Sequence, residues 1–218
     1  MRLLWRCKEV HPHDGGMRSA RSLAETRAFF ASRAATWDTK FGDDLPAYAA
    51  AVRDAAFTDR GVVVDLGCGT GRALEPLRDA VGPAGTVLGV DVTDEMLAAA
   101  AAHDRARHAV LLLADARKLP LADRAVDGIF AAGLLQHLSD PEGGLVELAR
   151  VTRPGGRLAL FHPSGRAALA ARHGHELRPD EPLAEVPLEN ATRRTGWRLQ
   201  RYDDPPTRFF ALAIRLDA

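Results

Sequence analysis

The sequence contains little cysteine and no apolar run long enough to cross a membrane. Its 218 residues include two cysteines, Cys7 and Cys68, and no stretch approaches the about 18 apolar residues of a membrane span. Two cysteines so placed make no disulfide framework, which suits a reducing compartment. The first ten residues are partly basic but lack an apolar core and a cleavage site. We therefore expect no signal peptide, no membrane partner and a cytoplasmic location.

A charge surplus is also missing. Lys and Arg together number 29, as do Asp and Glu, so the formal net charge is zero. General nucleic-acid binders usually carry a basic surplus, so we expect no nucleic-acid partner. The length suits one α/β domain with a substantial core. No internal repeat and no spacing typical of a catalytic triad is present.

The most informative stretch is residues 62–71, which read V-V-V-D-L-G-C-G-T-G. The β-branched run predicts a buried strand, and a helix pattern follows through Leu74 and Leu77. Glycines between a strand and a helix let the backbone approach a ligand closely, while the helix start offers free N–H groups. A dinucleotide fingerprint counted from Gly67 requires its third glycine at Arg72, which disfavours a nicotinamide dehydrogenase.

Three acids close three successive predicted strands. Asp65 ends the first strand, Asp91 ends the strand at 86–90, and Asp115 follows the strand at 109–113. Alternation of strands with helices predicts a parallel sheet, whose strand ends meet at one edge. A carboxylate such as that of Asp91 accepts two hydrogen bonds, which suits the two hydroxyls of a ribose. The alternative is that Asp91 only caps a helix or a turn.

The remaining pattern completes the sheet. Further strands are predicted at 125–132, 157–161, 196–202 and 208–216, and helices at 142–151, 167–172 and, weakened by Pro187, at 183–194. The short link between the last two strands predicts an antiparallel pair. Before the first strand, helices are predicted at 22–35 and 44–57, separated by an aromatic break at 36–42.

Two blocks resemble the class I S-adenosylmethionine-dependent methyltransferases, namely D-x-G-x-G-x-G at 65–71 and D-G-I-F-A-A-G-L-L-Q-H-L followed by E-L-A-R-V-T-R-P-G-G-R-L. The resemblance covers residues 62–161. It implies a Rossmann-like, doubly wound α/β fold with seven strands, mostly parallel with one antiparallel strand, and helices on both faces. It also implies that S-adenosylmethionine is the cofactor, yielding S-adenosylhomocysteine, and that its contacts are Asp65, Gly67, Cys68, Gly69, Asp91, Val92, Met96, Asp115, Ala116 and Ala132.

The N-terminal part is similar to the cap of small-molecule methyltransferases, on the wording F-F at 29–30 and R-A-A-T-W-D at 33–38. In that family the cap folds over the cofactor, which implies roles there for Trp37 and Phe41. The alternative is that both aromatics only staple two helices together. We expect a flexible tail at 1–16, a helical cap at 17–60 and the methyltransferase domain at 61–218, and translation starting at Met17 is an alternative to Met1.

Two histidines are candidates for a general base. His137 follows the fourth strand and His162 ends the fifth, so both can face the space where a methyl acceptor approaches. Histidine titrates near neutrality and can accept a proton, although methyl transfer needs a base only when the nucleophile arrives protonated. We favour His162, because His137 has a packing alternative. The pair His173 and His175 lacks further ligands at metal-site spacing, so we expect no metal.

These observations predict an enzyme that transfers a methyl group from S-adenosylmethionine to an O, N or C atom of a small molecule. The alternative is a protein of the same fold that binds the cofactor, its product or a partner without transfer. We expect a monomer or a homodimer. The acceptor is not predicted, since the region from Pro163 to Asn190, which with the cap determines acceptor choice, matches no pattern that we recognise.

Overall fold

The computed structural model describes residues 22–41 and 44–217, without the side chain of Phe41. The predicted tail at 1–16 therefore lies outside the described residues. The described strands form one seven-stranded sheet in the order β3-β2-β1-β4-β5-β7-β6. They are β1 (Val62–Leu66), β2 (Thr86–Asp91), β3 (Val110–Leu113), β4 (Val126–Ala132), β5 (Thr152–His162), β6 (Trp197–Asp203) and β7 (Phe209–Arg215).

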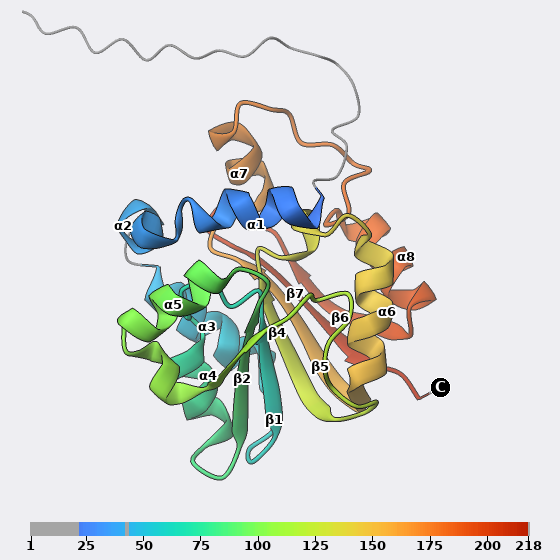
Figure 1. Ribbon diagram of the computed structural model, residues 1–218. Coiled ribbons are helices and arrows are strands. Elements are labelled where there is room, and N and C mark those ends of the chain that lie inside the picture. Colours follow the sequence, from blue (N-terminus) through green and yellow to red (C-terminus); the bar gives the residue numbers. More distant parts are fainter. Residues whose placement is uncertain (1–21, 42–43, 218) are drawn as a thin grey trace, which may run out of the picture.

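Helices cover both faces of this sheet (Figure 1). One face carries α3 (Leu45–Ala55), α4 (Leu74–Val81) and α5 (Asp94–Ala102), and the other carries α6 (Pro141–Val151) and α8 (Glu185–Arg194). Above the edge where the parallel strands end lie α1 (Leu23–Ala31) and α7 (Arg166–Arg172). Three 3-10 turns, η1 (Ala34–Thr36), η2 (Arg105–His108) and η3 (Leu135–His137), complete these connections together with α2 (Trp37–Phe41).

Alternation along the strands divides the core into two layers. In β1, Val63 packs with the layer under α3 and α4, while Val64 packs with the layer under α6 and α8. Successive side chains of a strand point to opposite faces, so a continuous apolar run is what a strand covered on both sides requires. The predicted fold class is confirmed, and β7 is the reversed strand, since it pairs antiparallel with both β5 and β6.

The helix predicted at 22–35 ends at Ala31, and the structure also differs from the sequence prediction at the aromatic break and at the fifth strand. The aromatic break predicted at 36–42 was wrong for its described part, because η1 and α2 make residues 34–41 helical. The fifth strand begins five residues early, at Thr152 rather than Arg157, because Thr152 pairs with Val126 ahead of an irregularity in the β4–β5 register. The turn R-P-G-G at 153–156 is thus inside the strand rather than before it.

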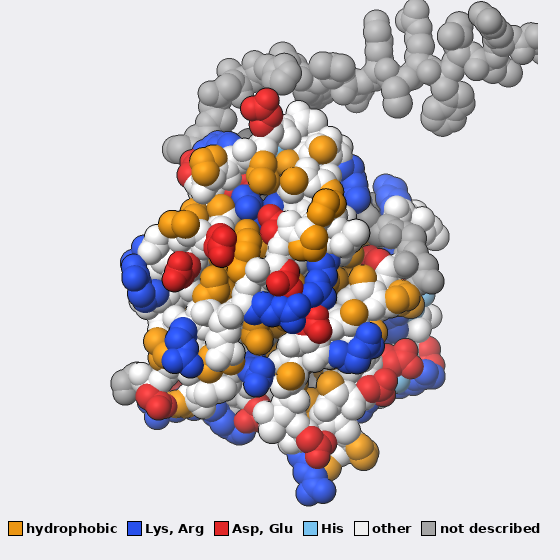
Figure 2. Space-filling model, turned by 180° about the vertical axis from the view of Figure 1, so that it is seen from behind, with side chains coloured by type: hydrophobic (Ala, Val, Ile, Leu, Met, Phe, Trp, Pro, Cys, Tyr) orange, Lys and Arg blue, Asp and Glu red, His pale blue; other side chains and the backbone are white. Residues whose placement is uncertain are grey.

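The surface carries charges of both signs. On the face seen from behind, basic, acidic and apolar side chains are interspersed (Figure 2). Elsewhere on the molecule, Asp54 and Asp203 each form ion pairs with both Arg201 and Arg208. In the part of the chain that the structure describes, no helix is long and apolar enough to cross a membrane.

Trp197 offers a test of the core between α6 and β6. Its side chain is fully buried, and its indole N–H donates to the Leu145 carbonyl at 3.1 Å. Trp197→Phe should lower the free energy of unfolding by about 1–3 kcal/mol, since the carbonyl loses its donor inside the core. Urea unfolding followed by circular dichroism measures this. Val186→Ala, at an exposed position of α8, is the control and should unfold like wild type; equal midpoints for all three proteins would contradict the assignment.

Candidate functional site

The glycine loop after β1 is held against the end of β2. The N–H groups of Gly67 and Cys68 donate to the Val90 carbonyl, and that of Gly69 donates to Asp91 at 2.9 Å. Gly67 and Gly69 have φ angles of +69° and +53°, which L side chains rarely adopt. Among the described residues, a Cβ atom built on Gly69 would meet only the Met96 sulfur, at the ordinary van der Waals distance of 3.9 Å, so it is the positive φ that favours glycine here.

Asp65 and Asp91 are buried beside this loop. Asp65 is 2% exposed, and within residues 22–41 and 44–217 nothing hydrogen-bonds to its Oδ2 atom. Burial, reinforced by repulsion from Asp91, raises the pKa of Asp65 to about 8. Burial also raises the pKa of Asp91, although its carboxylate accepts from the N–H groups of Gly69 and Thr93. A buried carboxyl oxygen without a donor is what a cationic or N–H-bearing ligand would satisfy.

Asp115 differs from Asp65 and Asp91 because its carboxylate forms an ion pair with Arg117. The Arg117 guanidinium donates to both Asp115 oxygens at 2.7–3.1 Å, and its Nη1 reaches Ser139 at 2.9 Å. These hydrogen bonds keep the pKa of Asp115 below its usual range. The carboxylate is therefore ionised, and a ligand amine that approaches it must share it with Arg117.

The other residues predicted to contact the cofactor lie at the same edge. Val92 follows β2, Ala116 follows Asp115, and Ala132 ends β4. Cys68 is a free, buried thiol in the glycine loop, and burial raises its pKa well above the usual value. It is therefore a packing group rather than a nucleophile.

The two candidate bases end or follow neighbouring strands, since β4 pairs with β5. His162 is half-buried, and burial lowers its pKa, so the ring is neutral near pH 7. Its Nδ1 lies 3.0 Å from both the N–H and the carbonyl of Ser164, so the backbone accommodates either tautomer. His137 lies edge-on against Phe30 of α1, with ring centroids 5.3 Å apart, which supports a packing role.

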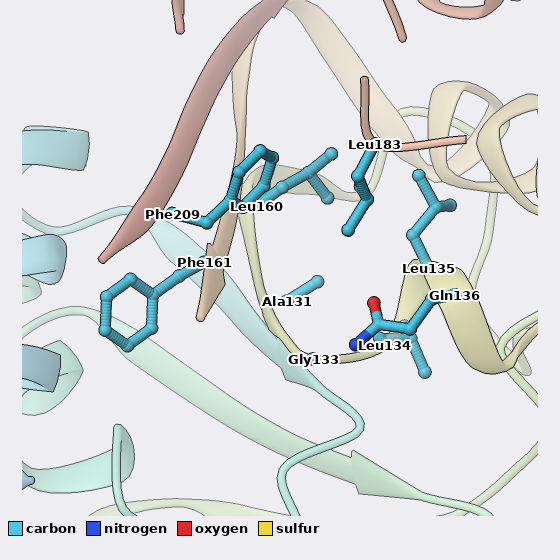
Figure 3. A pocket seen from close by; sticks show the side chains of 9 residues that line it. All are labelled: Ala131, Gly133, Leu134, Leu135, Gln136, Leu160, Phe161, Leu183 and Phe209. Carbon is cyan, nitrogen blue, oxygen red and sulfur yellow. The ribbon is translucent and has the colours of Figure 1, made fainter. Parts of the chain in front are cut away.

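A small apolar cavity lies near the ends of β4 and β5. It measures about 10 Å³, room for about one water molecule at most, and is lined from β4, η3, β5 and Leu183. Figure 3 shows the side chains of Leu135 and Leu183 beside it. A Cβ built on Gly133 would lie 3.7 Å from the His162 ring and 3.8 Å from the Gln136 amide nitrogen. These are ordinary van der Waals distances, so it is the φ of +63° that favours glycine at position 133.

The cap contacts the glycine loop through a charged residue that the sequence analysis missed. Asp38 of α2 accepts from Thr70 at 2.6 Å and from Arg72 at 3.2 Å, and it pairs with Arg105 at 2.7 Å. Trp37, beside it, packs on Phe30 with centroids 5.6 Å apart. The side chain of Phe41 lies outside the described residues. In the sequence, Arg72 could have pointed to this contact, because a positive charge next to a buried glycine loop requires a carboxylate partner.

The described residues hold no group of three or more His, Cys, Asp or Glu side chains that would suit a metal ion. The rings of His173 and His175 stack 6.4 Å apart on the surface.

The chain resembles known methyltransferases in sequence and in fold. A family model described as a methyltransferase domain matches residues 64–160. A protein in transposon TN4556 of Streptomyces fradiae, described as uncharacterized, is 43% identical over 101 residues, which is 46% of this chain and 29% of that protein. The O-methyltransferase resE of Aspergillus sclerotiorum is 31% identical over 153 residues, which is 65% of this chain and 56% of that protein. The chain thus spans less than two thirds of the length of either relative.

Other relatives carry names of O-methyltransferases and of ubiquinone/menaquinone C-methyltransferases. Among solved structures, a SAM-dependent methyltransferase from Aquifex aeolicus matches with a TM-score of 0.69 and 24% identity, over 85% of this chain and 98% of that one. This likeness concerns the fold, whereas the sequence match covers the glycine loop, the acids and the fourth and fifth strands. Residues 64–160 of the chain therefore carry a methyltransferase domain, and the fold is that of the class I S-adenosylmethionine-dependent methyltransferases.

Proposed function

We propose that this protein transfers a methyl group from S-adenosylmethionine to an oxygen, nitrogen or carbon atom of a small molecule. The observation that carries the proposal is the buried Oδ2 atom of Asp65, which has no hydrogen-bond partner among the described residues and lies near the end of β1, where the glycine loop begins. When bound, S-adenosylmethionine supplies an electrophilic methyl group on a positively charged sulfur.

In this proposal each of the three acids at the sheet edge binds a different part of the cofactor. Asp65 is the acceptor for its ammonium group, with the glycine loop at 67–69 around the methionine end. Asp91 is the acceptor for the ribose hydroxyls, because its oxygens retain lone pairs beyond the two backbone bonds. Asp115 accepts from the adenine amine, with Val92, Met96 and Ala116 lining the base and Ala132 the methionine.

The chain's own part in the reaction is alignment. Displacement at a sulfonium disperses charge, so the protein mainly has to hold the acceptor in line and exclude water. The cap with Trp37 and Phe41 covers this region, and His162 is the proposed base. That role requires the tautomer in which Nδ1–H donates to the Ser164 carbonyl, which leaves Nε2 free to accept a proton.

The test is a pair of measurements on the purified protein. Calorimetry with S-adenosylhomocysteine asks whether the site binds the product, and a panel of small hydroxyl, amine and carbon acceptors with methyl-labelled S-adenosylmethionine asks whether label is transferred. Binding with transfer supports the proposal. Binding without transfer to any acceptor favours the alternative of a binding protein, and tight NADH binding without S-adenosylhomocysteine binding refutes both.

Asp91 should dominate the ribose part of the affinity. Asp91→Asn keeps the shape but removes the charge, and hydrogen bonds to charged groups contribute about 1.5–3 kcal/mol. We expect affinity for S-adenosylhomocysteine to fall about tenfold to a hundredfold by calorimetry. Asp123→Asn, at a side chain that is 76% exposed, is the matched control and should bind like wild type. Equal affinities for the three proteins would remove Asp91 from the site.

Asp65 should make cofactor binding release a proton. Its pKa is about 8 in the free protein, so at pH 6 the carboxyl is protonated, and pairing with an ammonium group favours the ionised form. Calorimetry with S-adenosylhomocysteine in buffers of different ionisation enthalpy measures the released proton. Asp65→Asn should remove it, and a binding heat that is independent of the buffer in wild type would contradict the assignment.

The same raised pKa affects stability. Between the unfolded pKa near 3.8 and the folded pKa near 8, the folded state binds the proton that the unfolded state has lost. The contribution of Asp65 to stability therefore falls as pH rises from about 4 to 8, and Asp65→Asn should weaken this dependence in urea unfolding.

His162 should matter for turnover rather than for cofactor binding. Once an acceptor is known, His162→Ala should lower kcat, leave S-adenosylhomocysteine affinity unchanged and remove the acidic limb of the pH–rate profile. That limb should lie below pH 6.5, because burial lowers the pKa of the ring. His137→Ala is the comparison. If both variants keep the turnover and pH profile of wild type, transfer proceeds by alignment alone.

A further inference from the structure

A cluster of charged side chains joins the cap to the glycine loop. We call Asp38, Thr70, Arg72 and Arg105 the loop clamp. Asp38 Oδ1 accepts from the Thr70 hydroxyl at 2.6 Å and from Arg72 Nε at 3.2 Å, while Oδ2 pairs with Arg105 at 2.7 Å. The Arg72 side chain is only 5% exposed and also pairs with Asp44. This is a cluster shielded from solvent rather than a pair of surface charges.

The clamp acts on the middle of the loop. Thr70 is buried and lies between Gly69 and Gly71, which both have positive φ. Its hydroxyl donates to Asp38, and its carbonyl accepts from Arg105 at 2.9 Å. On the other side of the loop, Asp91 holds the Gly69 N–H. The sheet thus fixes one end of the loop and the cap fixes the other.

The charge of Asp38 is necessary for this arrangement. Arg72 and Arg105 both point at it, and His103 lies 3.6 Å from its Oδ2. Without this carboxylate, Asp44 alone would face the two guanidinium groups, and only Arg72 reaches it. An uncompensated charge in a site with little water is costly, so the arginines and the loop would have to move. Thr70 would move with them, since Arg105 holds its carbonyl.

We infer that Asp38 is a positioning residue, through which the cap fixes the glycine loop in the shape that receives the methionine end of the cofactor. The inference rests on the proposed function. It makes the cap a standing part of the cofactor site, joined to the loop by the clamp, rather than a lid that only closes over it. Asp38 touches neither cofactor nor acceptor in this role.

The experiment compares two ligands by calorimetry. S-adenosylhomocysteine carries the amino-acid end, and 5′-methylthioadenosine has the same nucleoside but no amino or carboxyl group. Asp38→Asn should lower the affinity for S-adenosylhomocysteine by tenfold or more and the affinity for 5′-methylthioadenosine by less than threefold. Asp38→Glu, which restores the charge, should recover part of the affinity. Asp104→Asn is the matched control, because that carboxylate is 74% exposed, pairs with Arg107 and also neighbours η2; it should bind both ligands like wild type.

Several results would contradict the inference on Asp38 or the proposed function. Unchanged affinity of Asp38→Asn for S-adenosylhomocysteine, or an equal loss for both ligands, overturns the inference, since an equal loss is what general destabilisation produces. If Asp38→Asn does not fold, Thr70→Val answers the same question, because it removes the hydroxyl without leaving a charge unpaired. Thr70→Val should then lose affinity for S-adenosylhomocysteine selectively, and wild-type binding of both ligands overturns the inference. A wild-type protein that binds neither ligand refutes the proposed function instead.

Discussion

The glycine loop at residues 67–71 has almost no side chains with which to hold its own shape. Glycine loses more conformational freedom on folding than any other residue, so a loop with three glycines of positive φ needs contacts from outside. Two of those contacts are carboxylates, since Asp91 at the end of β2 binds one backbone N–H and Asp38 in the cap binds Thr70, and the Val90 carbonyl and Arg105 supply others. The sheet, the loop and the cap therefore depend on the same few buried charges.

Burying a charged group lowers the stability of the fold, and this cost differs between Asp38 and Asp65. Asp38 is compensated by two arginines, which together with the Thr70 hydroxyl hold its pKa below the usual range against the effect of burial. Asp65 has no such partner and instead holds its proton near neutral pH. Groups left uncompensated inside a fold mark functional sites more often than structural ones. On the proposed function, this difference separates Asp38, which holds the loop in place, from Asp65, which binds the ligand.

The sequence was sufficient for the strands and for the acids at their ends, because both follow from local patterns. The β-branched run at 62–64 and the alternation of strands with helices determine the sheet, and each acid lies within two residues of the end of its strand. It was not sufficient for α2, where aromatic residues at 37 and 41 suggested a break. It also missed the pairing of Asp38 with Arg72, which are 34 residues apart, since local patterns carry no information on which distant side chains meet.

Different interactions hold the two sides of the sheet edge, the one proposed to bind the cofactor and the one proposed to bind the acceptor. Arg166 at the start of α7 joins Glu181 to Asp204, and Tyr202 donates to the Leu183 carbonyl, so the segment between β5 and β6 packs as one unit. Across from it, α1 brings Phe30 against His137. Glycine backbone, carboxylates and arginines hold the loop on the side proposed for the cofactor, whereas on the other side packed rings join the ion pairs of Arg166. On the proposed function, we expect acceptor choice to depend on the cap and on residues 163–190, so the motifs within residues 62–161 relate the chain to methyltransferases and leave the acceptor open.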